Sequence, residues 1–481
     1  MRLLNLSSSS SNFLFKRLIV SSLILSLILG FSGCSSIGFK DLFSDYATQL
    51  KDARAAQLKG DFKTAATLIT EPQAAQNNYT LNLLEKARLH FLGNDWAQSR
   101  KDFSLVSQVL DLQAVKAKLR LSRGVSKVAS LVSSDNVIAY QVSAYEQTML
   151  HSYQALNYLF LGELEGALVE VRRANLVQEN ALRENQQALD KDNLNFDKKS
   201  LKQAYPSMSA MIGDIKNGFQ NAYTFYLSGL LYEAASQPDD AYIDYKRALK
   251  IYPSNHYLQK DVLRLATQLG MTDDLALFTA KYGAYQASTM TNSGELVVLL
   301  ENGVVSPKQE VSIDLPIFSG AGQPRFFSFA LPVYNGTLIK YPTLTINQAE
   351  RTYTSEQIVR LQSLASKQLQ QQMPGLVARQ ALRLIAKEKL RDTMSQKGGD
   401  IGNILAVLYN VASEQADTRS WLTLPDEVQI LRLSLPPGKQ TIELNLAGKT
   451  ELIEVNIQAK RISLINFTTI GNFQSHKVTQ L

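Results

Sequence analysis

Four histidines and one cysteine are the residues of this chain best suited to metal binding or nucleophilic catalysis. None of the histidines, His90, His151, His256 and His476, has a second histidine or a carboxylate at the spacing of a recognised metal site. The sequence also lacks a Gly-x-Ser-x-Gly elbow. We therefore expect no catalytic residues, no metal site and no cofactor, and we expect the histidines inside helical patterns to be structural.

The cysteine lies at the end of a segment that has the order of a targeting signal. Lys16 and Arg17 precede an apolar run, Leu18–Leu29, and the small residues before Cys34 follow it. The run is shorter than the roughly 20 apolar residues that span a membrane. The segment resembles a bacterial lipoprotein signal peptide, which implies that residues 1–33 are removed and that Cys34 carries lipid. The alternative is an ordinary secretory signal with a chance cysteine.

The residues after the cysteine extend this expectation. Residues 34–45 would form a tether, and serine rather than aspartate after Cys34 favours the outer membrane by the same resemblance. The mature chain would then be lipid-anchored and face the periplasm. The formal charge of +7 over 481 residues is a weak bias, and no basic run with interleaved aromatic residues predicts a nucleic-acid partner.

Asp417, Arg419 and Trp421 are the polar and aromatic constellation best suited to recognition. A carboxylate and a guanidinium this close can form a charge-assisted pair, and Trp421 is one of only two tryptophans. The three residues follow a predicted helix and precede a predicted strand, where loops often carry function. Either they fix the helix to the sheet, or they bind a partner.

The segment Ala222–Asn255 predicts two packed helices joined by a turn. Gly229 and Ala241 are small residues suited to a helix crossing, and Pro253 ends the second helix. Its 34-residue length and these spacings resemble a tetratricopeptide repeat. Similar units are expected at Tyr46–Pro72, Tyr79–Val109, Thr148–Ala174 and His256–Ala280. Residues 46–290 are therefore expected to form an all-α tetratricopeptide-like solenoid, with an irregular helical bundle as the alternative.

Such a solenoid implies a concave groove that binds envelope proteins. Aromatic residues of the predicted helices are candidates for partner contact, namely Tyr153, Tyr158, Tyr223, Tyr226 and Tyr232. The alternative hypothesis is that the same tyrosines bind peptidoglycan or another envelope polysaccharide.

The pattern changes near residue 291 to short β-branched runs. Residues 291–481 are expected to form an α+β domain with an antiparallel sheet or sandwich, interrupted by a helical insertion at 355–415. Asn302-Gly303 predicts a hairpin. Four later strands are expected at Val428–Leu435, Gln440–Leu446, Glu451–Ile457 and Arg461–Phe467.

Three stretches resemble a family of uncharacterised bacterial lipoproteins that join an N-terminal repeat region to a C-terminal mixed domain. They are GELVVLLENG at 294–303, ALPVY at 330–334 and ADTRSWLTLPDEVQ at 416–429. The resemblance implies the domain order but no activity. The resulting hypothesis is a non-catalytic, lipid-anchored scaffold.

Overall fold

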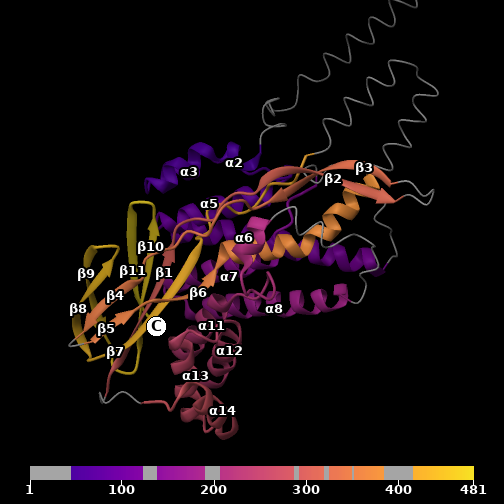
Figure 1. The fold of residues 1–481 in the computed structure, drawn as a ribbon. Coiled ribbons are helices and arrows are strands. Elements are labelled where there is room, and N and C mark those ends of the chain that lie inside the picture. The colour runs from indigo at the N-terminus through magenta and orange to yellow at the C-terminus, as the bar shows by residue number, and fades with distance from the viewer. Residues whose placement is uncertain are drawn as a thin grey trace, which may run out of the picture. The chain divides into compact units, whose positions relative to one another are not determined.

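The computed structural model describes residues 45–122, 138–189, 206–286, 292–318, 324–348, 351–383 and 415–481. The predicted signal peptide, Cys34 and nearly all of the predicted tether lie outside these residues. Residues 46–481 form one compact unit that contains both the helices and the strands (Figure 1). No helix in the described part of the chain is both long and apolar enough to cross a membrane.

The N-terminal part of the unit is a series of helical hairpins, each packed against the next. The hairpins are α3–α4, α5–α6, α7–α8, α11–α12 and α13–α14. The helices are α2 (Tyr46–Gln49), α3 (Lys51–Leu58), α4 (Phe62–Leu68), α5 (Tyr79–Leu92), α6 (Trp96–Ser122), α7 (Ala144–Phe160), α8 (Leu164–Leu189), α10 (Pro206–Ile212), α11 (Ala222–Ala234), α12 (Pro238–Ile251), α13 (His256–Leu269) and α14 (Thr272–Tyr282). Five hairpins therefore lie at the five predicted units.

Local sequence explains where these helices begin and cross. The Asn221 side chain accepts hydrogen bonds from the backbone of Tyr223 and Thr224 and so caps α11. Gly229 lies directly against the Tyr245 ring, since a Cβ there would be 2.5 Å from Tyr245 Cε1. The predicted close crossing is present, with a tyrosine ring in contact with the glycine.

The strands of the described residues form three sheets. They are β1 (Gly294–Asn302), β2 (Gln309–Phe318), β3 (Pro324–Val333), β4 (Leu344–Gln348), β5 (Arg351–Thr354), β6 (Glu356–Arg360), β7 (Glu427–Leu435), β8 (Gly438–Leu446), β9 (Lys449–Ile457), β10 (Ile462–Ile470) and β11 (Phe473–Gln480). The orders are β11-β10-β1-β7-β6, β2-β3 and β5-β4-β8-β9. Figure 1 shows the five-stranded sheet between the helices and the four-stranded sheet.

The expected antiparallel pairing is present in every described strand pair except one, because β1 and β10 of the five-stranded sheet pair in parallel. Both strands are almost entirely buried, as expected for strands covered on both faces. Consecutive strands are also divided between sheets, since β7 and β10 belong to the five-stranded sheet while β8 and β9 belong to the four-stranded sheet. The spacing of strands along the sequence does not show which strands belong to which sheet.

Three other local predictions need correction. Asn302-Gly303 does not turn a hairpin, because β1 pairs with β7 and β10 on either side. The helical insertion does not begin at 355, since residues 356–360 form β6 and pair with β7 before helix 361–383 begins. Tertiary pairing outweighs the helical spacing there. Strand β11 was not predicted.

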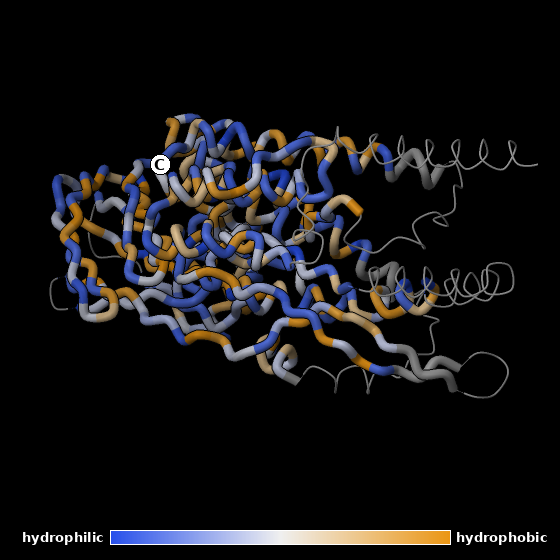
Figure 2. Tube along the Cα trace, turned by 90° about the horizontal axis from the view of Figure 1, so that it is seen from above, coloured by the Kyte–Doolittle hydropathy of each residue, from blue (hydrophilic) through white to orange (hydrophobic). Residues whose placement is uncertain are grey.

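Apolar residues of the helices and strands together form one core. Figure 2 shows apolar and polar positions alternating closely along the trace, as expected for elements that each bury part of their surface. Helix α11 departs from this pattern, because Ala222 through Tyr232 are all buried. An all-round buried helix requires cover on its inner side as well, and the sheet supplies it.

Candidate functional site

The first helices of the hairpins, α5, α7, α11 and α13, have polar side chains that contact the chain's own sheet region. Arg88 of α5 forms an ion pair with Glu301 of β1 at 2.5 Å, and both side chains are fully buried. Tyr153 of α7 donates its hydroxyl to the same carboxylate at 2.9 Å. The face on which a partner groove was predicted is therefore covered by β1 at these positions.

A second buried charge cluster ties the last hairpins to β7. Arg432 Nη2 of β7 lies 2.9 Å from Glu233 Oε2 of α11, and Arg432 Nη1 lies 3.0 Å from Asp261 Oδ1 of α13. Arg264 contacts the same two carboxylates. Moving α11 and α13 away from β7 would separate these buried charges from their partners, which is strongly unfavourable. The cluster therefore favours the docked position of the helices on the sheet.

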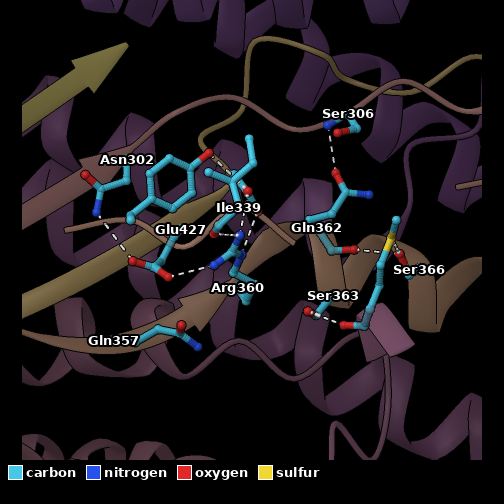
Figure 3. A network of polar contacts seen from close by, with 12 residues as sticks. Asn302, Ser306, Ile339, Gln357, Arg360, Gln362, Ser363, Ser366 and Glu427 are labelled. Carbon is cyan, nitrogen blue, oxygen red and sulfur yellow. Dashed lines mark hydrogen bonds and ion pairs between the residues drawn. The ribbon is translucent and has the colours of Figure 1, made fainter. Parts of the chain in front are cut away.

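A third cluster surrounds Arg360 at the end of β6 (Figure 3). Its guanidinium pairs with Asp426 and Glu427, each at 2.9 Å, and Figure 3 shows it directed at Glu427 beside Ile339. Just beyond, the backbone N–H of Ser306 donates to the Gln362 side chain at 2.7 Å. The cluster fixes the point where the chain leaves the sheet and enters helix 361–383.

Burial contradicts the prediction that the helical tyrosines form a binding surface. Tyr153, Tyr223 and Tyr226 have no exposed area, and Tyr232 retains 7%. Tyr158 is partly exposed. Four of the five rings thus belong to the core, because the sheet region covers the inner side of the helices that carry them.

Trp421 and its neighbours dock between the helices and the sheet. The Trp421 ring is fully buried, and its centroid lies 5.8 Å from Phe103 and 6.1 Å from Tyr153. Arg419 Nη2 lies 2.7 Å from Asp417 Oδ2, as the charge-assisted pair predicts. The structural interpretation of this constellation accounts for Trp421.

Two buried carboxylates hold the backbone of this segment. Glu146 accepts from the Trp421 N–H at 3.0 Å. Glu85 accepts from the N–H groups of Leu422 and Thr423 at 2.6 and 2.9 Å. Burial raises the pKa of Glu85 to about 7, although these hydrogen bonds and the charge of Arg54 act against that rise.

The raised pKa of Glu85 predicts a pH-dependent stability. The folded state binds the proton more tightly than the unfolded chain, whose ordinary value is 4.5. The contribution of Glu85 to stability therefore falls as pH rises from about 4.5 to about 7, by about 3 kcal/mol. Replacing Glu85 with glutamine should remove most of that decrease, measured as the free energy of unfolding in urea at pH 5, 6, 7 and 8. An unchanged pH slope in the variant would contradict this assignment.

A cavity of about 500 Å³ opens beside the same segment. We call it the Lys308 cavity. It is lined by residues of 138–146, by Lys308, by Pro332 and Tyr334, by residues 365–379 of helix 361–383, and by Asp417 and Arg419. The helical and sheet regions both contribute to its wall, and its size is typical of ligand pockets. Of the predicted site residues, Asp417 and Arg419 line it, whereas Trp421 and the five tyrosines do not.

Most charges around the cavity are paired. Asp417 accepts from Arg419 Nε at 2.8 Å and Nη2 at 2.7 Å. Burial alone would raise the pKa of Asp417, but Arg419 brings it below its ordinary value. The Glu146 carboxylate accepts from Tyr140 Oη at 2.7 Å and from the Ser143 N–H at 2.9 Å.

Lys308 is the half-buried cation of the wall. Its ammonium donates one hydrogen bond, at 2.8 Å, to the Arg419 carbonyl. Burial lowers the pKa of Lys308, while Asp417 and Glu146 act in the opposite direction. Nothing in the sequence around Lys308 marks it as a site residue, because its neighbours in the cavity come from distant segments.

Gly218 packs closely against helix 361–383 at Gln368, which is a residue of the cavity wall. A Cβ on Gly218 would lie 2.4 Å from the Gln368 backbone nitrogen, so the helix would have to move. Gly218→Ala is therefore expected to lower the free energy of unfolding by about 1–3 kcal/mol. Gly375→Ala is the matched control, because the nearest atom there is 3.6 Å away and the helix gains an alanine. Equal stabilities of the two variants in chemical denaturation would contradict the close contact.

Each histidine is paired with a carboxylate. His90, His151 and His256 lie 2.8, 2.7 and 2.7 Å from Asp102, Glu170 and Glu356, and His476 lies 2.7 Å from Glu451. Within the described ranges, no three His, Cys, Asp or Glu side chains are placed to hold a metal ion. These pairs are consistent with structural histidines.

No protein-family model and no curated protein matches this chain. Solved structures similar to parts of it include a crystal structure of MamA (13% identity, covering 48% of this chain and 91% of that chain, TM-score 0.27). They also include MamA from Desulfovibrio magneticus RS-1 (12%, 50% and 93%, 0.26) and the TPR2AB domain–pHSP90 complex of yeast Sti1 (10%, 48% and 87%, 0.19). Scores this low do not establish a shared fold, so the hairpin assignment rests on the contacts described above.

Proposed function

We propose that this protein is a non-catalytic scaffold, anchored by lipid on Cys34 and facing the periplasm, that holds an envelope protein at the Lys308 cavity. The cavity is the observation that carries the proposal. It combines a half-buried cation with a wall built by several segments, whereas the inner face of the helices already contacts the sheet. Tetratricopeptide-like hairpins then act as a rigid support for the sheet region.

The lipid anchor is supported by sequence. The charged, apolar and small-residue segments precede Cys34 in the order of a bacterial lipoprotein signal. Outer-membrane placement follows from the same resemblance. The proposed polysaccharide-binding function loses its contact surface, because four of the five tyrosines assigned to it are buried.

Affinity capture from crosslinked envelopes tests the proposal. The native lipoprotein should enrich one or a few envelope proteins, and Cys34→Ala should abolish that enrichment by removing the anchor. Gln141→Trp should abolish it as well, because Gln141 is an exposed residue of the cavity wall and a large ring there blocks entry. Lys250→Trp, at an exposed position of α12, is the matched control and should leave capture unchanged.

Capture by Gln141→Trp at the level of the native protein would remove the cavity from the proposal. Enrichment of cell-wall material without a protein would favour the polysaccharide alternative over the scaffold.

A further inference from the structure

A buried acceptor in the wall of the Lys308 cavity lacks a partner. Gln368 Oε1 has no hydrogen-bond donor among the described residues, although the atom is shielded from solvent. A buried carbonyl without a donor costs about 1–3 kcal/mol. Gln368 is itself only partly buried and lines the cavity, so a rotation of its side chain would bring this atom to the cavity surface. A ligand N–H or O–H group that meets the atom there would recover that free energy.

Lys308, in contrast, needs a hydrogen-bond acceptor, because its ammonium is a donor. An ammonium has three N–H donors, and Lys308 donates one to the Arg419 carbonyl at 2.8 Å. The carboxylate of Asp417 is held by two hydrogen bonds from the Arg419 guanidinium and one from the Arg419 backbone N–H. Glu146 is likewise held by Tyr140, Ser143 and Trp421. The Lys308 ammonium therefore has N–H donors available for an incoming anion, whereas the two neighbouring carboxylates already accept hydrogen bonds from other residues.

The ligand must thus carry an anionic acceptor and a hydrogen-bond donor together. Acetate and sulfate supply only the acceptor, whereas a peptide containing aspartate or glutamate supplies both. Three further glutamines, Gln141, Gln371 and Gln372, line the same cavity. Side-chain amides carry a donor and an acceptor and so match the polar groups of an extended backbone.

An acidic sugar also carries a carboxylate and hydroxyl donors. Sugar binding commonly uses an aromatic face as a platform, and the rings that line this cavity are those of Tyr140, Tyr145 and Tyr334. All three are buried, with 6%, 5% and 1% of their surface exposed. The wall therefore favours a peptide over a saccharide.

We infer that the Lys308 cavity binds an extended acidic segment of the partner protein, with a carboxylate side chain on Lys308 and a backbone N–H on Gln368 Oε1. This inference rests on the proposed function and specifies the chemistry of its partner.

Matched hexapeptide pools test it. Both ends of each peptide are blocked, and the central residue is glutamate in one pool and glutamine in the other, so the side chain is the only carboxylate. Binding to the full lipoprotein in detergent is measured by competition with a fluorescent member of the glutamate pool. The glutamate pool should bind about tenfold more tightly than the glutamine pool.

Variants assign that preference to its residues. Lys308→Gln should abolish the preference for glutamate, whereas Lys308→Arg should keep it. The control Lys449→Gln, at an exposed position of β9, should not change it. Gln368→Leu should weaken both pools about tenfold while the preference for glutamate remains. Circular dichroism melting checks that each variant is folded.

The pH dependence gives an independent readout. Affinity for the glutamate pool should fall as pH rises through the lowered pKa of Lys308, because the neutral amine no longer attracts a carboxylate. Asp417, Glu146 and Arg419 act electrostatically on Lys308, and Arg379 of helix 361–383 lines the same cavity. Lys308→Arg should remove the dependence in this range.

Equal binding of the two pools would overturn the inference, as would cavity-dependent binding of muropeptide glycans without peptide binding. If Gln141→Trp still abolishes envelope capture while the pools bind equally, the inference fails and the scaffold function stands. If capture is also insensitive to Gln141→Trp, both fail.

Discussion

Replacing Trp421 with alanine is expected to lower the free energy of unfolding by about 3–5 kcal/mol. The side chain is fully buried against Phe103 and Tyr153, and its indole N–H donates to Thr423 Oγ1 at 2.8 Å. Alanine would leave a large cavity where the segment docks between helices and sheet. Urea unfolding followed by circular dichroism measures the change.

The other tryptophan supplies the control. Trp96 is only partly buried, and its ring contacts Phe160 and Lys477 near the helical surface. Trp96→Ala should therefore destabilise the protein clearly less than Trp421→Ala. A loss below about 1 kcal/mol for Trp421→Ala would mean that this segment does not fix the two regions together.

Breaking the ion pair between Arg88 and Glu301 should cost about 3–5 kcal/mol. Both side chains are fully buried, and Arg88 also lies over the Tyr153 ring, 4.2 Å from its centroid. Arg88→Met leaves a buried carboxylate without its cation, and Glu301→Gln leaves a buried guanidinium without its anion. Each single variant should therefore be strongly destabilised in chemical denaturation.

The double variant decides whether the two residues act as a pair. Arg88→Met combined with Glu301→Gln removes both charges, so its loss should be clearly smaller than the sum of the two single losses. In the native chain Tyr153 donates to Glu301 Oε1 and Thr468 donates to Glu301 Oε2. The glutamine offers one acceptor oxygen to one of these hydroxyls, and its amide N–H can donate to the oxygen of the other. Additive losses would show that the pair is not coupled.

Local sequence signals predicted the helical hairpins well. Gly229, Pro253 and the 34-residue spacing depend on contacts within one hairpin, which short-range patterns record. The same holds for the Asp417–Arg419 pair, whose partners are two residues apart. These features involve no segment from elsewhere in the chain.

The docking of the sheet on the helices was not predictable in the same way. Glu85, Arg88 and Glu301 look like solvent-facing residues in a local pattern, yet all three are buried, and Arg88 and Glu301 pair across 213 positions. One usable signal was missed. The stretch AYTFYLSGLLY of α11 is apolar on all sides, which indicates a helix covered on every face rather than a groove wall.

The cavity residues show the same limit. Lys308, which directly precedes β2, and Gln368, on helix 361–383, line the same cavity although they are 60 positions apart in the chain. Neither residue belongs to a motif. Gln368 stands out because its Oε1 lacks a donor, and Lys308 stands out because its ammonium is half-buried in the cavity wall. Both properties appear only in the folded chain.

Site-specific photocrosslinking in living cells tests the central claim most directly, namely that a partner protein occupies the Lys308 cavity. A photoreactive amino acid is placed at Gln141 or Gln372, two exposed residues of the wall that come from different segments. A third protein carries it at Ile243, which is 48% exposed on α12. The account predicts that both cavity positions crosslink the same envelope protein and that the α12 position does not. Crosslinks from the α12 position alone would contradict it.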